Sequence, residues 1–203
     1  MNFTEGEIYH IYNRGNKRDK IFFKEKNYLF FLEKLKIHVH PHADIIAWCL
    51  MPNHFHLMVK VNKTTIEIQN KESSKSDPKS RNLNQSIGIM LRSYTNAIQI
   101  QENITGSLFQ QKTKSICLSE LQKISPSYFN TEYGTMINNF EFKSYEQICF
   151  EYIHLNPVKA KLVDSPEKWE FSSYKDYAGL RNGRLVNREL GMKYFEETIR
   201  LIK

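Results

Sequence analysis

DIIAWCLMPNHFHLMVKV, residues 44–61, consists of two apolar runs on either side of a turn signal. Residues 44–50 and 54–61 are rich in β-branched, aromatic and other large apolar side chains, whereas residues 51–53 (MPN) are typical of a tight turn. Two strands joined this closely form an antiparallel hairpin. The other predicted elements are arranged around this hairpin.

Two histidines, His54 and His56, stand two positions apart on the second strand of the hairpin. Because side chains on a strand alternate between its faces, both imidazoles point to one side and Phe55 points to the other. If Phe55 packs against helices, the histidines lie on the open face of the sheet. Two protonated imidazoles would repel each other there, and a shared divalent cation removes that repulsion. The alternative is that one or both are ordinary surface or hydrogen-bonded histidines.

The rest of the chain supplies strands and helices in an order that indicates a fold class. Strand, helix, strand, strand, helix, strand is a βαββαβ arrangement, so we predict an α+β protein. Its centre would be a ferredoxin-like antiparallel sheet with helices packed on one face, followed by an additional helix. The segments outside the hairpin that carry this pattern are a strand at 7–13, helices at 26–42 and 83–101, a strand at 112–118 and a helix at 145–156.

A chain of 203 residues has the length of one domain of ordinary size or of one domain with an appendage. We expect a single domain over residues 1–180 and a C-terminal helical extension over residues 181–203. Residues 62–84 are polar and nearly without large apolar side chains, which predicts a flexible loop. Residues 119–143 show no regular period, and we predict an irregular insertion there.

The charge balance points to a class of partner. The chain has 29 Lys and Arg against 22 Asp and Glu, a formal net charge of +7. A surface of this sign attracts polyanions because binding releases their counterions. Nucleic acid is therefore the leading class of partner, although many basic proteins bind none.

The three cysteines, Cys49, Cys117 and Cys149, are isolated in apolar surroundings and form no C-x-x-C motif. This usage indicates buried thiols in a reducing compartment and no zinc finger. The first residues lack the pattern of a signal peptide, and no window approaches the roughly 20 apolar residues of a membrane span. We expect a cytoplasmic protein with no membrane partner.

Three stretches together resemble the REP-associated tyrosine transposases, which belong to the single-tyrosine transposases of the HUH endonuclease superfamily. They are MPNHFHLMV at 51–59, GSLFQQKTKS at 106–115 and YIHLNPVKAKLV at 152–163. The resemblance covers roughly residues 8–180, and its first and third stretches are the most specific. It implies a metal-dependent single-strand DNA endonuclease and strand transferase, or transposase, that forms a 5′-phosphotyrosine.

The resemblance also implies roles for particular residues. His54 and His56 match the metal-binding pair, Tyr152 matches the nucleophile on the additional helix, and Asn156 matches a third, amide ligand. Imidazole and amide donors suit Mg²⁺ or Mn²⁺ as the cofactor. Polar and basic residues in two loops match positions of the family that would contact single-stranded or hairpin DNA, namely Asn13, Arg14, Lys17, Arg18, Gln110, Gln111, Lys112 and Lys114.

Each part of the predicted site answers a chemical need. On a helix, Tyr152 and Asn156 lie one turn apart, about 6 Å along the axis, and on one face. A free tyrosine has a pKa of about 10, so roughly one in a thousand is phenolate at pH 7. Phenolate is nevertheless a good nucleophile and a tolerable leaving group, and a metal acts as a Lewis acid on the phosphodiester. The bond between tyrosine and DNA can then be reversed, so that strands are rejoined without ATP.

Several of these residues have plainer interpretations. Tyr152 could be a buried aromatic residue of an amphipathic helix. Asn156 could be the N-cap of a separate helix over residues 157–163. Tyr94 is the nearest rival nucleophile, although its spacing favours core packing. We expect His154 to be structural, and we expect His38, His40 and His42 to be solvated.

Other functions also fit parts of the sequence. The main alternative is a domesticated DNA hairpin-binding protein that performs no transposition. An RNA-binding module lacks its two aromatic sheet motifs here, and a histidine-based metal nuclease would use water in place of Tyr152. Related transposases act as dimers whereas relatives tied to REP hairpins can be monomers, so a homodimer remains one possible assembly.

Overall fold

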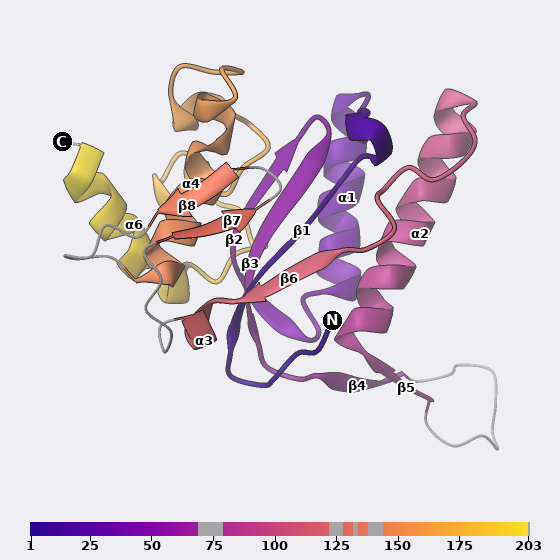
Figure 1. The fold of residues 1–203 in the computed structure, drawn as a ribbon, viewed down its shortest axis with the longest axis horizontal. Coiled ribbons are helices and arrows are strands. Elements are labelled where there is room, and N and C mark those ends of the chain that lie inside the picture. The colour runs from indigo at the N-terminus through magenta and orange to yellow at the C-terminus, as the bar shows by residue number, and fades with distance from the viewer. Residues whose placement is uncertain (69–78, 122–127, 132–133, 138–143, 203) are drawn as a thin grey trace.

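A four-stranded antiparallel sheet, in the order β2-β3-β1-β6, forms the centre of the molecule (Figure 1). The structure, a computed structural model, describes residues 1–68, 79–121, 128–131, 134–137 and 144–202. The strands of the sheet are β1 (Ile8–Arg14), β2 (Ala43–Met51), β3 (His54–Val61) and β6 (Lys114–Cys117).

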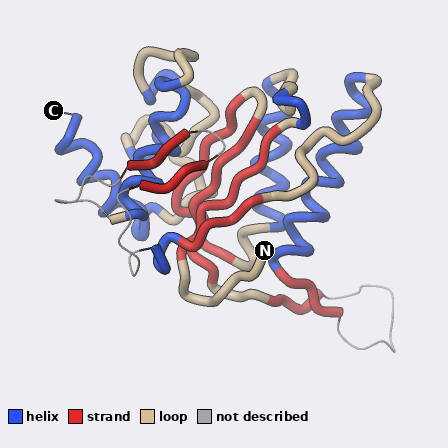
Figure 2. Tube along the Cα trace, viewed as in Figure 1, coloured by secondary structure: helices blue, strands red, loops and turns tan. Residues whose placement is uncertain are grey.

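Two long helices, α1 (Glu25–His38) and α2 (Leu83–Glu102), lie side by side on one face of this sheet (Figure 2). The four strands of this sheet and the two helices follow the predicted order βαββαβ, with a further hairpin inserted between β3 and α2. The prediction of an α+β fold with an antiparallel sheet is confirmed.

The core between the sheet and these helices is rich in aromatic rings. Phe55 of β3 lies 5.0 Å, ring centroid to centroid, from Phe31 of α1, and both side chains are fully buried. Tyr94 of α2 is also fully buried, and its hydroxyl donates to the carbonyl of Ile21 over 2.7 Å. The interpretation of Tyr94 as a core residue, and of Phe55 as facing the helices, is confirmed.

The opposite face of the sheet is covered by α4 (Tyr145–Lys159) and by C-terminal segments (Figure 1). The expectation that the histidines lie on an open face is therefore wrong. Ser173 connects this covering layer to the sheet. Its hydroxyl accepts the backbone N–H of Trp48 in β2 over 2.9 Å. The same hydroxyl lies 2.7 Å from Nε2 of the fully buried His154 of α4, as expected for a structural histidine.

Helix α4 continues through Pro157 to Lys159, so residues 157–163 do not form a separate helix. Asn156 lies within α4, and its backbone carbonyl accepts the N–H of Ala160, the C-cap of the same helix, over 2.9 Å. The N-cap alternative for Asn156 is therefore wrong. The helix ends where Lys161 adopts the left-handed conformation, with φ of +56°. A proline misled the sequence interpretation because it usually ends or starts a helix.

The predicted loop at 62–84 contains a two-stranded hairpin of β4 (Thr65–Ile68) and β5 (Lys79–Asn82). Strand β5 has the sequence KSRN, which contains no apolar residue. The alternation of apolar and polar residues that predicts a strand is therefore missing. Residues 69–78 lie outside the described part of the chain.

The predicted irregular stretch at 119–143 also contains regular elements. Strands β7 (Tyr128–Thr131) and β8 (Gly134–Ile137) pair as a hairpin there, after a short helix α3 (Leu118–Leu121). The rest of that stretch lies outside the described residues.

The remaining elements are short, apart from α6 (Arg188–Ile202) in the predicted C-terminal extension. Helix α6 packs on α4, and the amide of Gln147 donates to the carbonyl of Tyr194 over 3.0 Å. In the described part of the chain, no helix is both long and apolar enough to cross a membrane. The short elements are η1 (Asn16–Arg18), η2 (Pro166–Lys168) and α5 (Tyr174–Tyr177).

The histidines near the end of α1 are less exposed than predicted. His40 is exposed, but His38 is buried and His42 is fully buried. Nε2 of His42 lies 2.8 Å from the hydroxyl of Ser86 in α2, so this histidine links the start of β2 to the helix layer. The prediction that all three are solvated is wrong for His38 and His42, and His42 is covered by α2, which is distant in sequence.

Candidate functional site

The two histidines of β3 face α4 and lie against each other. The ring centroids of His54 and His56 are 4.9 Å apart, and their planes are nearly perpendicular at 83°. His56 is fully buried, whereas His54 is half-buried at the edge of a pocket. The alternation of side chains along β3 thus brings both imidazoles to the face opposite Phe55, as the sequence predicts.

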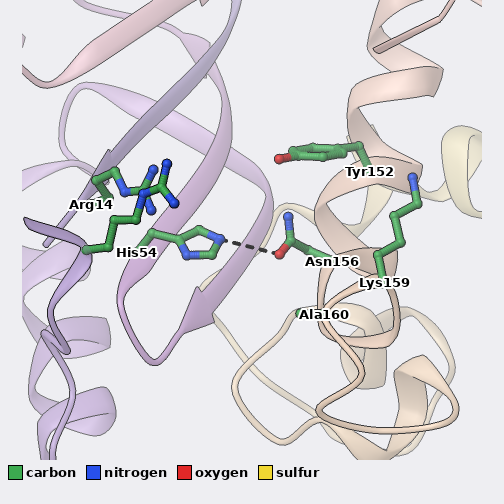
Figure 3. Close-up of a pocket in the computed structure, with 7 residues that line it drawn as sticks. Arg14, His54, Tyr152, Asn156, Lys159 and Ala160 are labelled. Carbon is green, nitrogen blue, oxygen red and sulfur yellow. Dashed lines mark hydrogen bonds between the residues drawn. The ribbon is translucent and has the colours of Figure 1, made fainter. Parts of the chain in front are cut away.

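Asn156 of α4 reaches across to both imidazoles, and Figure 3 shows its contact with His54. Its Oδ1 lies 3.3 Å from Nε2 of His54, and its Nδ2 lies 3.4 Å from Nε2 of His56. Three polar side chains from a strand and a distant helix therefore meet at one point. No group of three or more His, Cys, Asp or Glu side chains that could hold a metal ion occurs within the described residues. Besides the two imidazoles, the third protein ligand at this point would therefore be the amide oxygen of Asn156.

The separation of the amide oxygen from one imidazole nitrogen fits a shared cation. Two ligands that each lie about 2.1 Å from one ion, at about 90–110° to each other, are about 3.0–3.4 Å apart. The 3.3 Å between Oδ1 of Asn156 and Nε2 of His54 falls in this range. Imidazole nitrogens and an amide oxygen form a donor set of intermediate hardness, which suits Mn²⁺ or Mg²⁺ with other positions left for oxygen ligands.

The hydrogen bonds of His54 provide a second test of this fit. Nδ1 of His54 lies 2.6 Å from Oδ1 of Asn53, and an amide oxygen only accepts, so Nδ1 carries the proton. In a neutral imidazole Nε2 then holds a lone pair, and it faces the oxygen of Asn156. A cation next to these two atoms would turn a contact between lone pairs into shared coordination.

Burial keeps both histidines in the neutral form that binds metal. Desolvation lowers the pKa of His54 to about 4, with a further lowering by the nearby charge of Arg14 and an opposing effect of the bond to Asn156. Desolvation, with His54 and His10 as lesser causes, lowers the pKa of His56 well below its usual range. At pH 7 each imidazole therefore has a lone pair.

Tyr152 lies one helical turn before Asn156 on the same side of α4. Its ring centroid is 5.2 Å from that of His56, and the rings meet edge to face at 79°. The side chain is 8% exposed, and its hydroxyl points from α4 toward the strands that carry His54 and Arg14 (Figure 3). The predicted nucleophile and the predicted metal ligands thus lie around one point.

A pocket of about 350 Å³ opens over this point. Its walls carry positive charge from two directions, since Arg14 ends β1, Arg18 ends the η1 turn after it, and Lys159 belongs to α4. This combination of cations with a phenol and an amide suits a phosphate group. The lining residues are Arg14, Arg18, His54, Tyr152, Asn156, Lys159 and Ala160.

Two residues near the site were not predicted from the sequence. Lys159 lies two helical turns after Tyr152, and its Nζ is 5.6 Å from the centre of the Tyr152 ring. That spacing of seven residues was a usable signal. His10 of β1 lies 3.0 Å from His56, from Nε2 to Nδ1. Its signal was weaker, because it requires the pairing of β1 with β3.

The predicted DNA-binding residues are only partly brought together. Arg14 and Arg18 line the pocket, but Asn13 is buried and its amide donates to Gln110 and Thr113, with 3.1 and 3.0 Å between the bonded atoms. Asn13 therefore holds the loop of Gln110 and Thr113 and does not line the pocket. The other predicted contacts lie outside the pocket lining: Lys17, Gln111 and Lys112 are exposed, and Gln110 and Lys114 are half-buried.

Comparison with solved structures finds this fold in a REP-associated tyrosine transposase bound to a REP hairpin. The TM-score is 0.57 at 13% sequence identity, over 93% of this chain and 95% of the other. No protein-family model and no curated protein matches the sequence. At the level of the fold, the similarity agrees with the resemblance seen in the sequence.

Proposed function

We propose that this chain is a metal-dependent single-strand DNA endonuclease and strand transferase of the tyrosine transposase type, with Tyr152 as its nucleophile. The observation that carries the proposal is the convergence of Tyr152, His54, His56 and Asn156 at one cationic pocket. The similar solved structure holds a DNA hairpin, which supports hairpin DNA as the substrate class.

The metal ligands in this proposal are Nε2 of His54, Nε2 of His56 and Oδ1 of Asn156. Mg²⁺ or Mn²⁺ bound there would polarise the scissile phosphate and stabilise charge on its oxygens. The protein supplies the neutral imidazoles through burial and orients His54 through Asn53.

Tyr152 performs the covalent step. Its phenolic oxygen forms a bond to phosphorus, the bond from phosphorus to the 3′ oxygen breaks, and the phenolic proton is in net terms transferred to that oxygen. The products are a 5′-phosphotyrosine and a free 3′-hydroxyl. Because the ester keeps the bond energy, a 3′-hydroxyl can attack it and rejoin strands, which is the transfer reaction.

The cations around the pocket favour this step electrostatically. Lys159 lies next to the Tyr152 ring and favours negative charge on the phenolic oxygen. Arg14 and Arg18, on the other side, would bind the phosphodiester and hold it toward the phenol.

The test is to incubate the protein with labelled hairpin oligonucleotides and Mn²⁺ and to measure the covalent protein–DNA adduct. We expect Tyr152→Phe to abolish the adduct and His54→Ala to reduce it at least 100-fold, because catalytic groups that act as a unit fail together. Tyr94→Phe, which removes a buried hydroxyl away from the pocket, is the matched control and should keep the adduct.

The other outcomes identify the alternatives. Hairpin binding with no adduct from the wild type would support the DNA-binding protein that performs no transposition. Strand cleavage that persists in Tyr152→Phe and is lost in His54→Ala would support a nuclease that uses water. Either result would overturn the proposal.

A further inference from the structure

His10 is a buried polar residue directly behind the candidate metal site. It lies on β1, its side chain is fully buried, and its ring centroid is 5.1 Å from that of His56. Tyr12 of the same strand stacks on it at 4.7 Å, and Tyr152 of α4 meets it edge to face at 6.1 Å. The ring is therefore held between the β1 face, His56 and the candidate nucleophile.

One contact of His10 is polar. Its Nε2 lies 3.0 Å from Nδ1 of His56, the nitrogen that points away from Asn156. Two imidazole nitrogens at this distance share one proton, so one ring donates and the other accepts. Which ring donates decides whether Nε2 of His56 has a lone pair.

The amide of Asn156 determines the direction of this bond. Its Nδ2 carries hydrogens and lies 3.4 Å from Nε2 of His56, so that nitrogen is the acceptor. The proton of neutral His56 is then on Nδ1, and Nδ1 donates to Nε2 of His10. The same tautomer keeps a lone pair on Nε2 of His56, which a metal would bind in place of the amide hydrogen.

Packing alone gives no reason for a histidine at position 10. The side chain is fully buried and lies against the rings of Tyr12 and His56. Its second nitrogen, Nδ1, has no hydrogen-bond partner within the described residues. An apolar ring would fill this space without an unsatisfied polar atom. The acceptor that His10 offers to His56 accounts for the histidine.

We propose that His10 is a positioning residue that fixes His56 in its Nδ1–H tautomer and orients its Nε2 toward the metal. The inference rests on the metal site of the proposed function and adds a residue to it. Outer partners of this kind commonly change metal affinity 10- to 100-fold when they are removed.

The test measures Mn²⁺ affinity without DNA, by electron paramagnetic resonance of the free ion. His10→Phe keeps a ring but removes the acceptor, and we expect its dissociation constant to rise about 10- to 100-fold. His10→Gln places an amide oxygen near the position of Nε2 and should recover most of the loss. His42→Phe removes another fully buried histidine, away from the pocket, and should keep the wild-type affinity.

A second measurement serves if the variants fail to fold. Nitrogen-15 NMR of the metal-free wild type reports the tautomer of His56 directly, and we expect the proton on Nδ1. A proton on Nε2 would overturn the role of His10. So would wild-type affinity in folded His10→Phe. A wild type that binds no Mn²⁺ would instead overturn the metal site of the proposed function, which separates the two failures.

Discussion

At the residue scale, the site combines groups whose roles depend on close neighbours. The imidazole of His54 is oriented by the preceding residue, Asn53, through a contact of 2.6 Å. An amide of α4 stands where many metal sites have a carboxylate, so the donor set carries no negative charge. Phosphate oxygens of bound DNA would then supply the negative charge and raise the affinity for a divalent ion above that of the protein alone.

Lys159 gives a prediction at this scale. Lys159→Met removes the charge beside the Tyr152 ring but keeps most of the apolar stem. We expect adduct formation to slow about 10-fold or more, corresponding to about 1.4 kcal/mol of transition-state stabilisation.

Lys161→Met is the matched control for Lys159→Met, because it removes a nearby exposed charge that does not line the pocket. Equal rates in the two variants would contradict a specific role for Lys159. The experiment measures single-turnover rates with saturating hairpin DNA.

At the element scale, α4 is the part on which the site depends, because it carries both Tyr152 and Asn156. Ser173 links this helix to the sheet, since its hydroxyl contacts both His154 of α4 and the backbone of Trp48 in β2. The placement of the nucleophile therefore rests on a hydroxyl that lies outside the pocket.

Ser173→Ala tests this link. It leaves the buried imidazole of His154 and the backbone N–H of Trp48 without the hydroxyl, so we expect a loss of about 1–3 kcal/mol in the free energy of unfolding. Urea denaturation measures the change. A loss below about 0.5 kcal/mol would show that α4 is held mainly by apolar packing.

The elements also show what a single sequence can and cannot predict. The hairpin at residues 44–61 and the helices α1 and α2 have a clear period, and the structure contains them. Strand β5 has no apolar residue, so its pairing with β4 was not predicted. The layer that covers His56 is formed by residues about 100 positions away, and local patterns do not encode which distant helix covers a face.

The same contrast applies to the site. The spacing of His54 and His56, and of Tyr152 and Asn156, follows from the geometry of one strand and one helix. The contact of His10 with His56 depends on strand register, in which Tyr12 pairs with His56. Lys159 enters the site because α4 does not end at Pro157.

At the scale of the whole molecule, several histidines are buried in the neutral form. Burial lowers the pKa of His10 and of His154 to about 3 and that of His56 well below its usual range. In the unfolded chain each has a pKa near 6.5. Below pH 6.5 the unfolded state binds protons that the native state does not, so the native state loses stability as the pH falls.

We therefore predict that the free energy of unfolding of the metal-free protein decreases between pH 6.5 and pH 4. The slope approaches about 1.4 kcal/mol per pH unit for each such histidine. His154→Gln removes one of these histidines and should reduce the slope by up to about 1.4 kcal/mol per pH unit. Urea denaturation across this range measures it, and a free energy independent of pH would contradict neutral burial.

The most direct measurement of the central claim is to identify the residue that becomes joined to DNA. After reaction with a hairpin oligonucleotide and Mn²⁺, trypsin releases the peptide of residues 144–159, which contains both Tyr145 and Tyr152. The account predicts that fragmentation mass spectrometry finds the 5′-phosphonucleotide on Tyr152. Attachment to Tyr145 or to any other residue, or binding of the hairpin with no attachment, would contradict it.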